Sequence, residues 1–157
     1  MKPTLYLETS VISYLTAKPS RDLIAYSRQE ITRDWWEKKR LEYEITISEV
    51  VLEEAAQGDK RAAKRRYQLI KDIRVLILNP LIRDLASLLL TRLEIPESAL
   101  PDLYHLSIAS HYGIDYLVTW NCKHLANARI IKDLNEFGRE MKFHVPVICT
   151  PIELLEA

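Results

Sequence analysis

The stretch LYLETSVISYL (residues 5–15) decides the fold, because it joins a short apolar run to an amphipathic run through three polar residues. The run Thr4–Leu7 is typical of a buried strand, and Val11–Leu15 predicts a short helix. Glu8 stands between them, where an ionised and unpaired carboxylate would cost on the order of several kcal/mol. Glu8 therefore needs a metal, a basic partner or an open cleft, unless it only starts the following helix, capped by Thr9 or Ser10.

The same alternation of short β-rich runs and longer amphipathic runs continues along the chain. Further strands are predicted at Glu44–Ile47, Arg74–Leu78, Tyr116–Thr119 and Val145–Ile148. Helices are predicted at Ser20–Arg40 with Ser20 as N-cap, Val50–Gln57, Lys60–Asp72, Leu81–Leu93, Asp102–Tyr112, Ile130–Met141 and from Thr150 onward. Strands separated by helices, without hairpin signals such as Asn-Gly, favour an α/β fold whose central parallel sheet is covered on both faces.

The composition favours a single domain over residues 1–157, in a reducing cytoplasm. No apolar run approaches the ~20 residues of a membrane span, and the N-terminal residues do not resemble a secretory signal. Cys122 and Cys149 are too few for a disulfide framework or a zinc knuckle. Lys+Arg and Asp+Glu balance at 22 each, which excludes a strong overall field but not a local basic rim around an acidic centre.

Polar residues stand near the predicted strand ends, where ligands bind to parallel sheets. The candidates are Glu8, Thr9 and Ser10 after the first strand; Glu49, Glu53 and Glu54 after the second; Asp102 and His105 before the fourth; and Asn121, Lys123 and His124 after it. Each motif alone has a plainer explanation. The acids suit the first turn of a helix, and His105 at one turn from Asp102 suits packing better than ligation.

Taken together, the polar residues near the predicted strand ends indicate a metal site. No Gly-rich phosphate loop and no Gly-x-Ser-x-Gly elbow is present, which counts against P-loop, Rossmann and α/β-hydrolase chemistry. Hard oxygen ligands without Cys or His clusters favour Mg²⁺ or Mn²⁺ over zinc. Such an ion activates water and neutralises charge at phosphorus, so the pattern indicates metal-assisted phosphodiester chemistry.

Three segments, LYLETSVISYL, ISEVVLEEAAQGD and LPDLYHLSIASHYGIDYLVTWNCKHLAN, resemble the PIN-domain family, and in particular the VapC-like toxins of type II toxin–antitoxin pairs. The resemblance implies a three-layer α/β/α PIN-like fold and cleavage of single-stranded RNA with Mg²⁺ or Mn²⁺. It also implies a homodimer and inhibition by a cognate antitoxin protein. The implied catalytic residues are Glu8, Glu54, Asp102 and Asn121, with Glu8 and Asp102 binding the metal. Supporting or substrate-contacting roles fall to Thr9, Ser10, His105, Lys123 and His124.

Two departures from the family pattern keep alternatives open. Many members have Asp where this chain has Glu8, and Asn121 replaces an acid. The alternatives are a catalytically weak PIN-like module that binds RNA or a protein partner, and a DNA nuclease with similar carboxylates. The basic residues within Lys60–Arg66 either steer RNA toward the acids or form a solvated helix face. The helix Leu81–Leu93 offers a dimer or antitoxin surface, with core packing as the other explanation.

Overall fold

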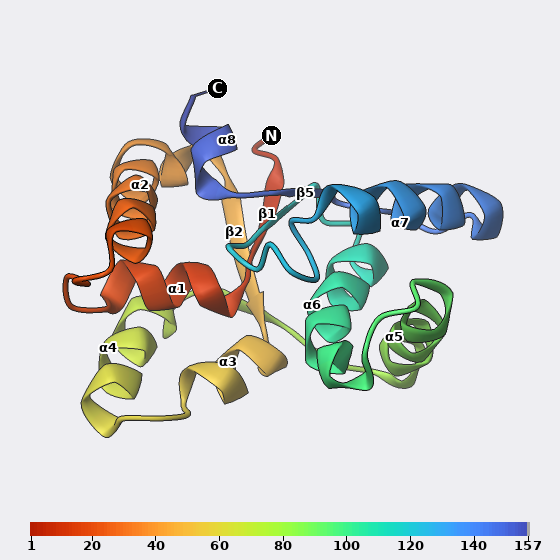
Figure 1. The fold of residues 1–157 in the computed structure, drawn as a ribbon, viewed down its shortest axis with the longest axis horizontal. Coiled ribbons are helices and arrows are strands. Elements are labelled where there is room, and N and C mark those ends of the chain that lie inside the picture. Colours follow the sequence, from red (N-terminus) through yellow and green to blue (C-terminus); the bar gives the residue numbers. More distant parts are fainter. Residues whose placement is uncertain (157) are drawn as a thin grey trace.

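A single five-stranded parallel sheet forms the centre of the computed structural model, which describes residues 1–156 (Figure 1). The strands lie in the order β3-β2-β1-β4-β5, and every neighbouring pair is parallel. Their bounds are β1 Thr4–Leu7, β2 Glu44–Ser48, β3 Arg74–Leu76, β4 Tyr116–Val118 and β5 Val147–Cys149. The predicted central parallel sheet is therefore confirmed.

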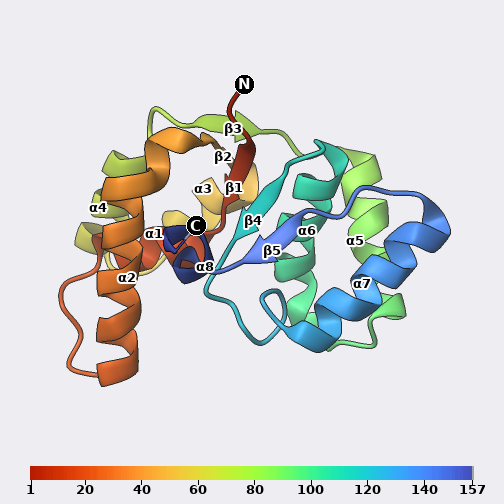
Figure 2. The same cartoon turned by 90° about the horizontal axis from the view of Figure 1, so that it is seen from above.

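Helices cover both faces of this sheet. They are α1 Thr9–Thr16, α2 Leu23–Lys39, α3 Glu49–Ala55, α4 Lys60–Ile70, α5 Pro80–Arg92, α6 Leu100–His111, α7 Ala128–Met141 and α8 Pro151–Leu155. Short 3₁₀ turns occupy Arg40–Glu42 and Glu97–Ala99. Figure 2 shows α1, α2 and α4 on one side of the sheet and α5, α6 and α7 on the other. This is a three-layer α/β/α arrangement, as the sequence predicted.

The strand order reverses between β1 and β4. From β1 the chain moves outward to β2 and β3, and then returns through α5 and α6 to the other side of β1 as β4. Leu7 is in register with Val118, and the amide of Glu8 continues the ladder with a 3.1 Å bond to the carbonyl of Val118. Glu8 and Thr119 are thus neighbours at a topological switch point, where α/β sheets bind ligands.

The core surrounds the central strands of the sheet. Leu5, Leu7, Ile47 and Leu117 are fully buried, and each such side chain contributes about 1.5–3 kcal/mol through burial. Trp35 is the largest fully buried side chain. Strand β1 pairs with β2 on one side and β4 on the other, so the position of Glu8, the residue that follows β1, is fixed by the sheet.

Several element ends differ from the sequence predictions, and three of them have clear local reasons. Asp22, not Ser20, caps α2, because its carboxylate accepts from Ala25 N while Ser20 Oγ accepts from Asp22 N. Strand β3 stops at Leu76, since Leu78 N donates to the Glu49 carboxylate at 2.7 Å. Strand β5 begins only at Val147, since the preceding residue, a proline, has no N–H for the ladder. Within residues 1–156, no helix is both long and apolar enough to cross a membrane.

Candidate functional site

Glu8 is a buried carboxylate held by neutral donors. Its side chain is 5% exposed and caps α1 by accepting from Ser10 N at 3.1 Å. Oε1 also accepts from the hydroxyls of Ser10 and Thr119, the latter at 2.6 Å. In the described part of the chain Glu8 forms no ion pair. A buried carboxylate surrounded by neutral donors alone retains a strong attraction for a cation.

Glu54 reaches the same edge from α3. Its Oε1 accepts from Thr9 Oγ1 at 2.7 Å and from His105 Nε2 at 2.5 Å. Of the other two acids of this motif, Glu53 is exposed and lies outside the group of Glu8, Glu54 and His105, and Glu49 accepts from Leu78 N. The structure therefore selects Glu54 from the three predicted candidates, as its position four residues after the inward-facing Val50 suggests.

His105 is fully buried between a phenol and a carboxylate. Its Nδ1 lies 2.6 Å from the hydroxyl of Tyr6, which in turn lies 2.7 Å from Ser48 Oγ. Since an ionised carboxylate only accepts, Nε2 must carry the hydrogen that points at Glu54. Both ring nitrogens are thus occupied by protein partners, so His105 orients Glu54 rather than offering a lone pair to a metal.

The electrostatics of this chain favour an ionised Glu54. Burial raises the pKa of Glu54, but the hydrogen bond and charge of His105 and the hydrogen bond from Thr9 more than offset this, and the pKa is lowered overall. Burial lowers the pKa of His105, yet its bond to Glu54 and the nearby charges of Glu8 and Asp102 leave it raised. Burial also raises the pKa of Tyr6 well above its ordinary value, which keeps the phenol protonated.

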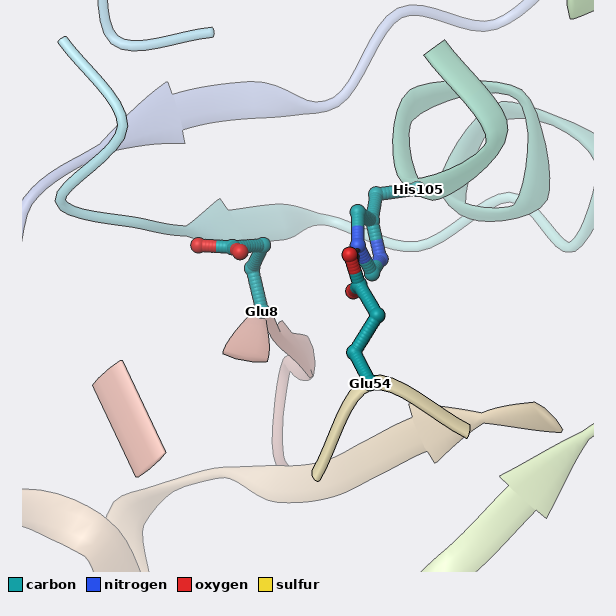
Figure 3. Close-up of side chains that lie close together, drawn as sticks. All are labelled: Glu8, Glu54 and His105. Carbon is teal, nitrogen blue, oxygen red and sulfur yellow. Dashed lines mark hydrogen bonds and ion pairs between the residues drawn. The ribbon is translucent and has the colours of Figure 1, made fainter. Parts of the chain in front are cut away.

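Each of the two carboxylates has one oxygen, Oε2, with few or no protein donors. Ligand atoms of Glu8, Glu54 and His105 lie within 4.8 Å of one another, and Figure 3 shows Glu54 directly beside the His105 ring. Among residues 1–156, Oε2 of Glu54 accepts no hydrogen bond, and Oε2 of Glu8 accepts only a shared one from Ser10 N. Two hard oxygen donors held this way fit Mg²⁺ or Mn²⁺.

Asp102 and Asn121 lie at the same edge but have other partners. Asp102 Oδ2 is 2.9 Å from Nδ1 of His124, and it lies outside the group formed by Glu8, Glu54 and His105. Asn121 Oδ1 accepts from His124 N at 3.0 Å, which closes the turn after β4. Lys123 is exposed. Of the predicted residues, the structure brings Glu8, Thr9, Ser10, Glu54 and His105 together most tightly.

Tyr6, Ser48 and Thr119 are the site residues that sequence reasoning did not single out. A tyrosine between two leucines in a buried strand was the available signal, because a buried phenol needs a hydrogen-bond partner. The sequence predicts Thr119 as the last residue of a strand, whereas it lies just beyond β4 and its hydroxyl donates to Glu8. Trp120 is buried next to this edge of the sheet, and its indole N–H donates to Thr32 Oγ1 at 2.8 Å.

Fold and site together define a three-layer α/β protein with a carboxylate pair at the switch point of its sheet. Comparison with known families identifies that class. A model of the PIN domain matches residues 5–124, and the chain belongs to the PIN-domain family, whose members are nucleases. A comparison with curated proteins finds no match.

Solved structures share this fold at low sequence identity. VapC20 of Mycobacterium tuberculosis, a toxin that cleaves the sarcin–ricin loop, is 18% identical with a TM-score of 0.60, over 76% of this chain and 92% of that one. VapBC2 of Rickettsia felis, bound to promoter DNA, is 19% identical with a TM-score of 0.52. VapBC-1 of nontypeable Haemophilus influenzae is 16% identical with a TM-score of 0.54. Both VapBC alignments cover 94% of this chain and 98% of the other.

Proposed function

We propose that this chain is a Mg²⁺- or Mn²⁺-dependent endoribonuclease that hydrolyses single-stranded RNA, acting as the toxin of a type II toxin–antitoxin pair. The observation that carries the proposal is the carboxylate pair of buried Glu8 and half-buried Glu54, whose Oε1 atoms are held by hydroxyl and imidazole donors, while Oε2 of Glu54 accepts no hydrogen bond in the described chain and Oε2 of Glu8 only a shared one from Ser10 N. Membership of a nuclease family and the likeness of the fold to VapC20 support it.

In this proposal the residues of the chain prepare the site before substrate arrives. Glu8 and Glu54 hold the cation, and Asp102 adds negative charge from the first turn of α6. His105 and Thr9 keep Glu54 ionised and fixed in one rotamer. A bound Mg²⁺ or Mn²⁺ supplies an activated water and neutralises charge on the scissile phosphate. Asn121 acts by fixing the turn that carries His124.

A pocket beside Glu54 has the chemistry to receive a nucleotide. Its volume is 390 Å³, and its walls include Glu54, Arg83 and Tyr104. An exposed guanidinium suits a phosphate, and an aromatic ring suits base stacking. These features favour RNA binding on the α3–α6 side of the acids.

Two partners belong to the proposal. A cognate antitoxin is supported by the likeness to two VapBC structures. A homodimer is supported by α5, which buries Ile82 and Leu89 but leaves Leu81 and Leu88 exposed. Sedimentation of the purified chain tests the dimer. A monomer at every concentration would contradict the proposed homodimer.

Cleavage of single-stranded RNA tests the enzyme itself. Labelled RNA is incubated with Mg²⁺ or Mn²⁺ and either the wild type or Glu54→Gln, and single-stranded DNA of the same sequence serves as the substrate control. We expect metal-dependent RNA cleavage that the variant loses. Equal cleavage by both proteins would overturn the role of Glu54, and equal cleavage of DNA would overturn the choice of RNA.

The second candidate is a catalytically weak module that binds RNA or a protein. The neutral Asn121 favours it, because its amide oxygen already accepts from His124 N and adds no negative charge. Calorimetric titration with Mn²⁺ separates the two. Saturable binding that Glu8→Gln abolishes supports the enzyme, whereas absent metal binding together with absent cleavage supports the binding module.

A further inference from the structure

One face of α4 forms a basic groove with the end of α1. Arg61, Lys64, Arg65 and Gln68 recur at the helical spacing that places side chains on one face. Together with Thr16 they line an open groove of 470 Å³. In Figure 1, α4 lies beside α1 and α3, the helices that follow β1 and β2.

The cations of this groove are uncompensated within the protein. Helix α4 carries five basic residues and no acidic one: Lys60, Arg61, Lys64, Arg65 and Arg66. Throughout residues 1–156 none of them forms an ion pair, whereas Arg33, Lys38 and Lys132 each do. Since the whole chain has a formal net charge of zero, this face is a local positive patch on a balanced surface.

Two of the arginines fix the groove to the helices of the carboxylate pair. Arg65 Nε donates to the carbonyl of Thr16 at 3.0 Å, and Arg66 Nε donates to that of Ala55 at 2.9 Å. Thr16 ends α1, which Glu8 caps, and Ala55 follows Glu54 in α3. At a rise of about 1.5 Å per residue, the groove begins about 12 Å along α1 from Glu8. The groove is therefore preformed at a fixed place relative to the acids.

We propose that this groove binds the phosphodiester backbone of single-stranded RNA on its way to the Glu8–Glu54 pair. The proposal rests on the proposed function and names the surface that supplies affinity for its substrate. Arg61 and Lys64 are exposed and make no hydrogen bond in the described chain, so both are available for phosphate. Contacts of this kind hold and orient a strand without reading its sequence.

The test replaces the two free cations and leaves the two anchoring arginines in place. The groove variant is Arg61→Glu/Lys64→Glu, and Arg61→Gln/Lys64→Gln is a milder second version. Lys132→Glu/Arg139→Glu on α7 makes the same change in charge on the opposite face. Binding of a fluorescent single-stranded RNA is followed by anisotropy without divalent metal, over a range of salt concentrations. Thermal melting checks that each protein is folded.

We expect the groove variant to bind RNA about tenfold or more weakly at low salt, while the α7 variant matches the wild type. The slope of log K against log salt should become shallower by about 1.4, for two phosphate contacts on a single strand. Equal affinity and slope in all proteins, or no RNA binding by the wild type, would overturn the proposal. Unchanged RNA binding with lost capture of an acidic protein partner would assign the groove to protein instead.

Cleavage kinetics separate this proposal from the proposed function. If the enzyme cleaves RNA, the groove variant should raise KM and leave kcat near the wild-type value. Cleavage with an unchanged KM would overturn the groove and leave the ribonuclease standing. Groove-dependent RNA binding by a protein that never cleaves RNA would overturn the ribonuclease and leave the groove as an RNA-binding surface.

Discussion

Nε2 of His105 lies 2.5 Å from Oε1 of Glu54, although 51 residues separate them in the sequence. The bond joins α6 to α3 across the carboxyl edge of the sheet, and Tyr6 on β1 closes it from the other side at 2.6 Å. One buried imidazole thus couples a central strand and two helices. The Glu54 carboxylate is consequently oriented by the fold itself rather than by the ion it is proposed to bind.

Replacing His105 by Phe should weaken the metal site and the fold together. Phenylalanine keeps a planar ring at this position, but Glu54 loses a donor and Tyr6 keeps only Ser48 as a partner, at a cost of about 1–3 kcal/mol in unfolding free energy. Affinity for Mn²⁺ should fall about 10–100-fold, the usual effect of removing a group that orients a ligand. Calorimetric titration measures the affinity and urea unfolding the stability. An unchanged Mn²⁺ affinity in a folded variant would show that His105 only packs.

Replacing Thr119 by Val should affect the metal site through Glu8. The hydroxyl donates to Glu8 Oε1 at 2.6 Å and accepts from Asn121 N at 2.9 Å, and Val keeps the shape without either bond. We expect at least about tenfold weaker Mn²⁺ binding. Thr46→Val is the matched control, because its buried hydroxyl donates to the Leu5 carbonyl, away from the acids. If both variants lower Mn²⁺ affinity equally, the effect comes from general loosening of the sheet.

The sequence predicted the elements better than the bonds between them. Apolar periodicity placed all five strands, and the acids after β1 and β2 follow from that placement. The Tyr6–His105 bond spans 99 residues and the Thr119–Glu8 bond spans 111, so no local pattern encodes either. The bond that uses Asn121 is local by contrast, since its amide oxygen accepts from His124 N three residues later, in the turn that follows β4. Candidate ligands were therefore visible in sequence, whereas the groups that orient them were not.

Asp115 should stabilise the fold in a pH-dependent way. Its carboxylate accepts from Thr4 N at 2.8 Å and Thr4 Oγ1 at 2.9 Å, and these two bonds lower the pKa of Asp115. A lowered folded-state pKa means that the contribution is complete above the unfolded value of about 3.9 and is lost as pH falls through the folded value. Asp115 is exposed, so the contribution stays below about 1 kcal/mol.

Urea unfolding of Asp115→Asn from about pH 7 to about pH 3 checks this sign. The variant should be less stable than the wild type at neutral pH, and the two should converge at the acid end. A difference that is constant over the whole range would mean that the charge of Asp115 contributes nothing.

Gly138→Ala should destabilise the packing of α7 although alanine is the better helix former. A Cβ at Gly138 would lie 2.5 Å from Val145 Cγ2 and 3.3 Å from the Phe143 carbonyl oxygen. Overpacking of this kind costs about 1–3 kcal/mol, which exceeds the propensity gain of about 1 kcal/mol. Thermal melting measures the loss, and Gly138→Ala/Val145→Ala should recover part of it. A more stable single variant would contradict the steric argument.

Asp102→Asn should separate charge from geometry at the metal site. The Asp102 carboxylate lies 2.9 Å from Nδ1 of His124, and an asparagine oxygen can accept the same bond, so the fold should change by less than about 0.5 kcal/mol. If Asp102 is a metal ligand, the variant should bind Mn²⁺ at least about tenfold more weakly and lose RNA cleavage. Calorimetric titration beside Glu8→Gln gives the comparison. Wild-type Mn²⁺ affinity in Asp102→Asn, with binding abolished by Glu8→Gln, would confine the ion to Glu8 and Glu54 and leave Asp102 to orient His124.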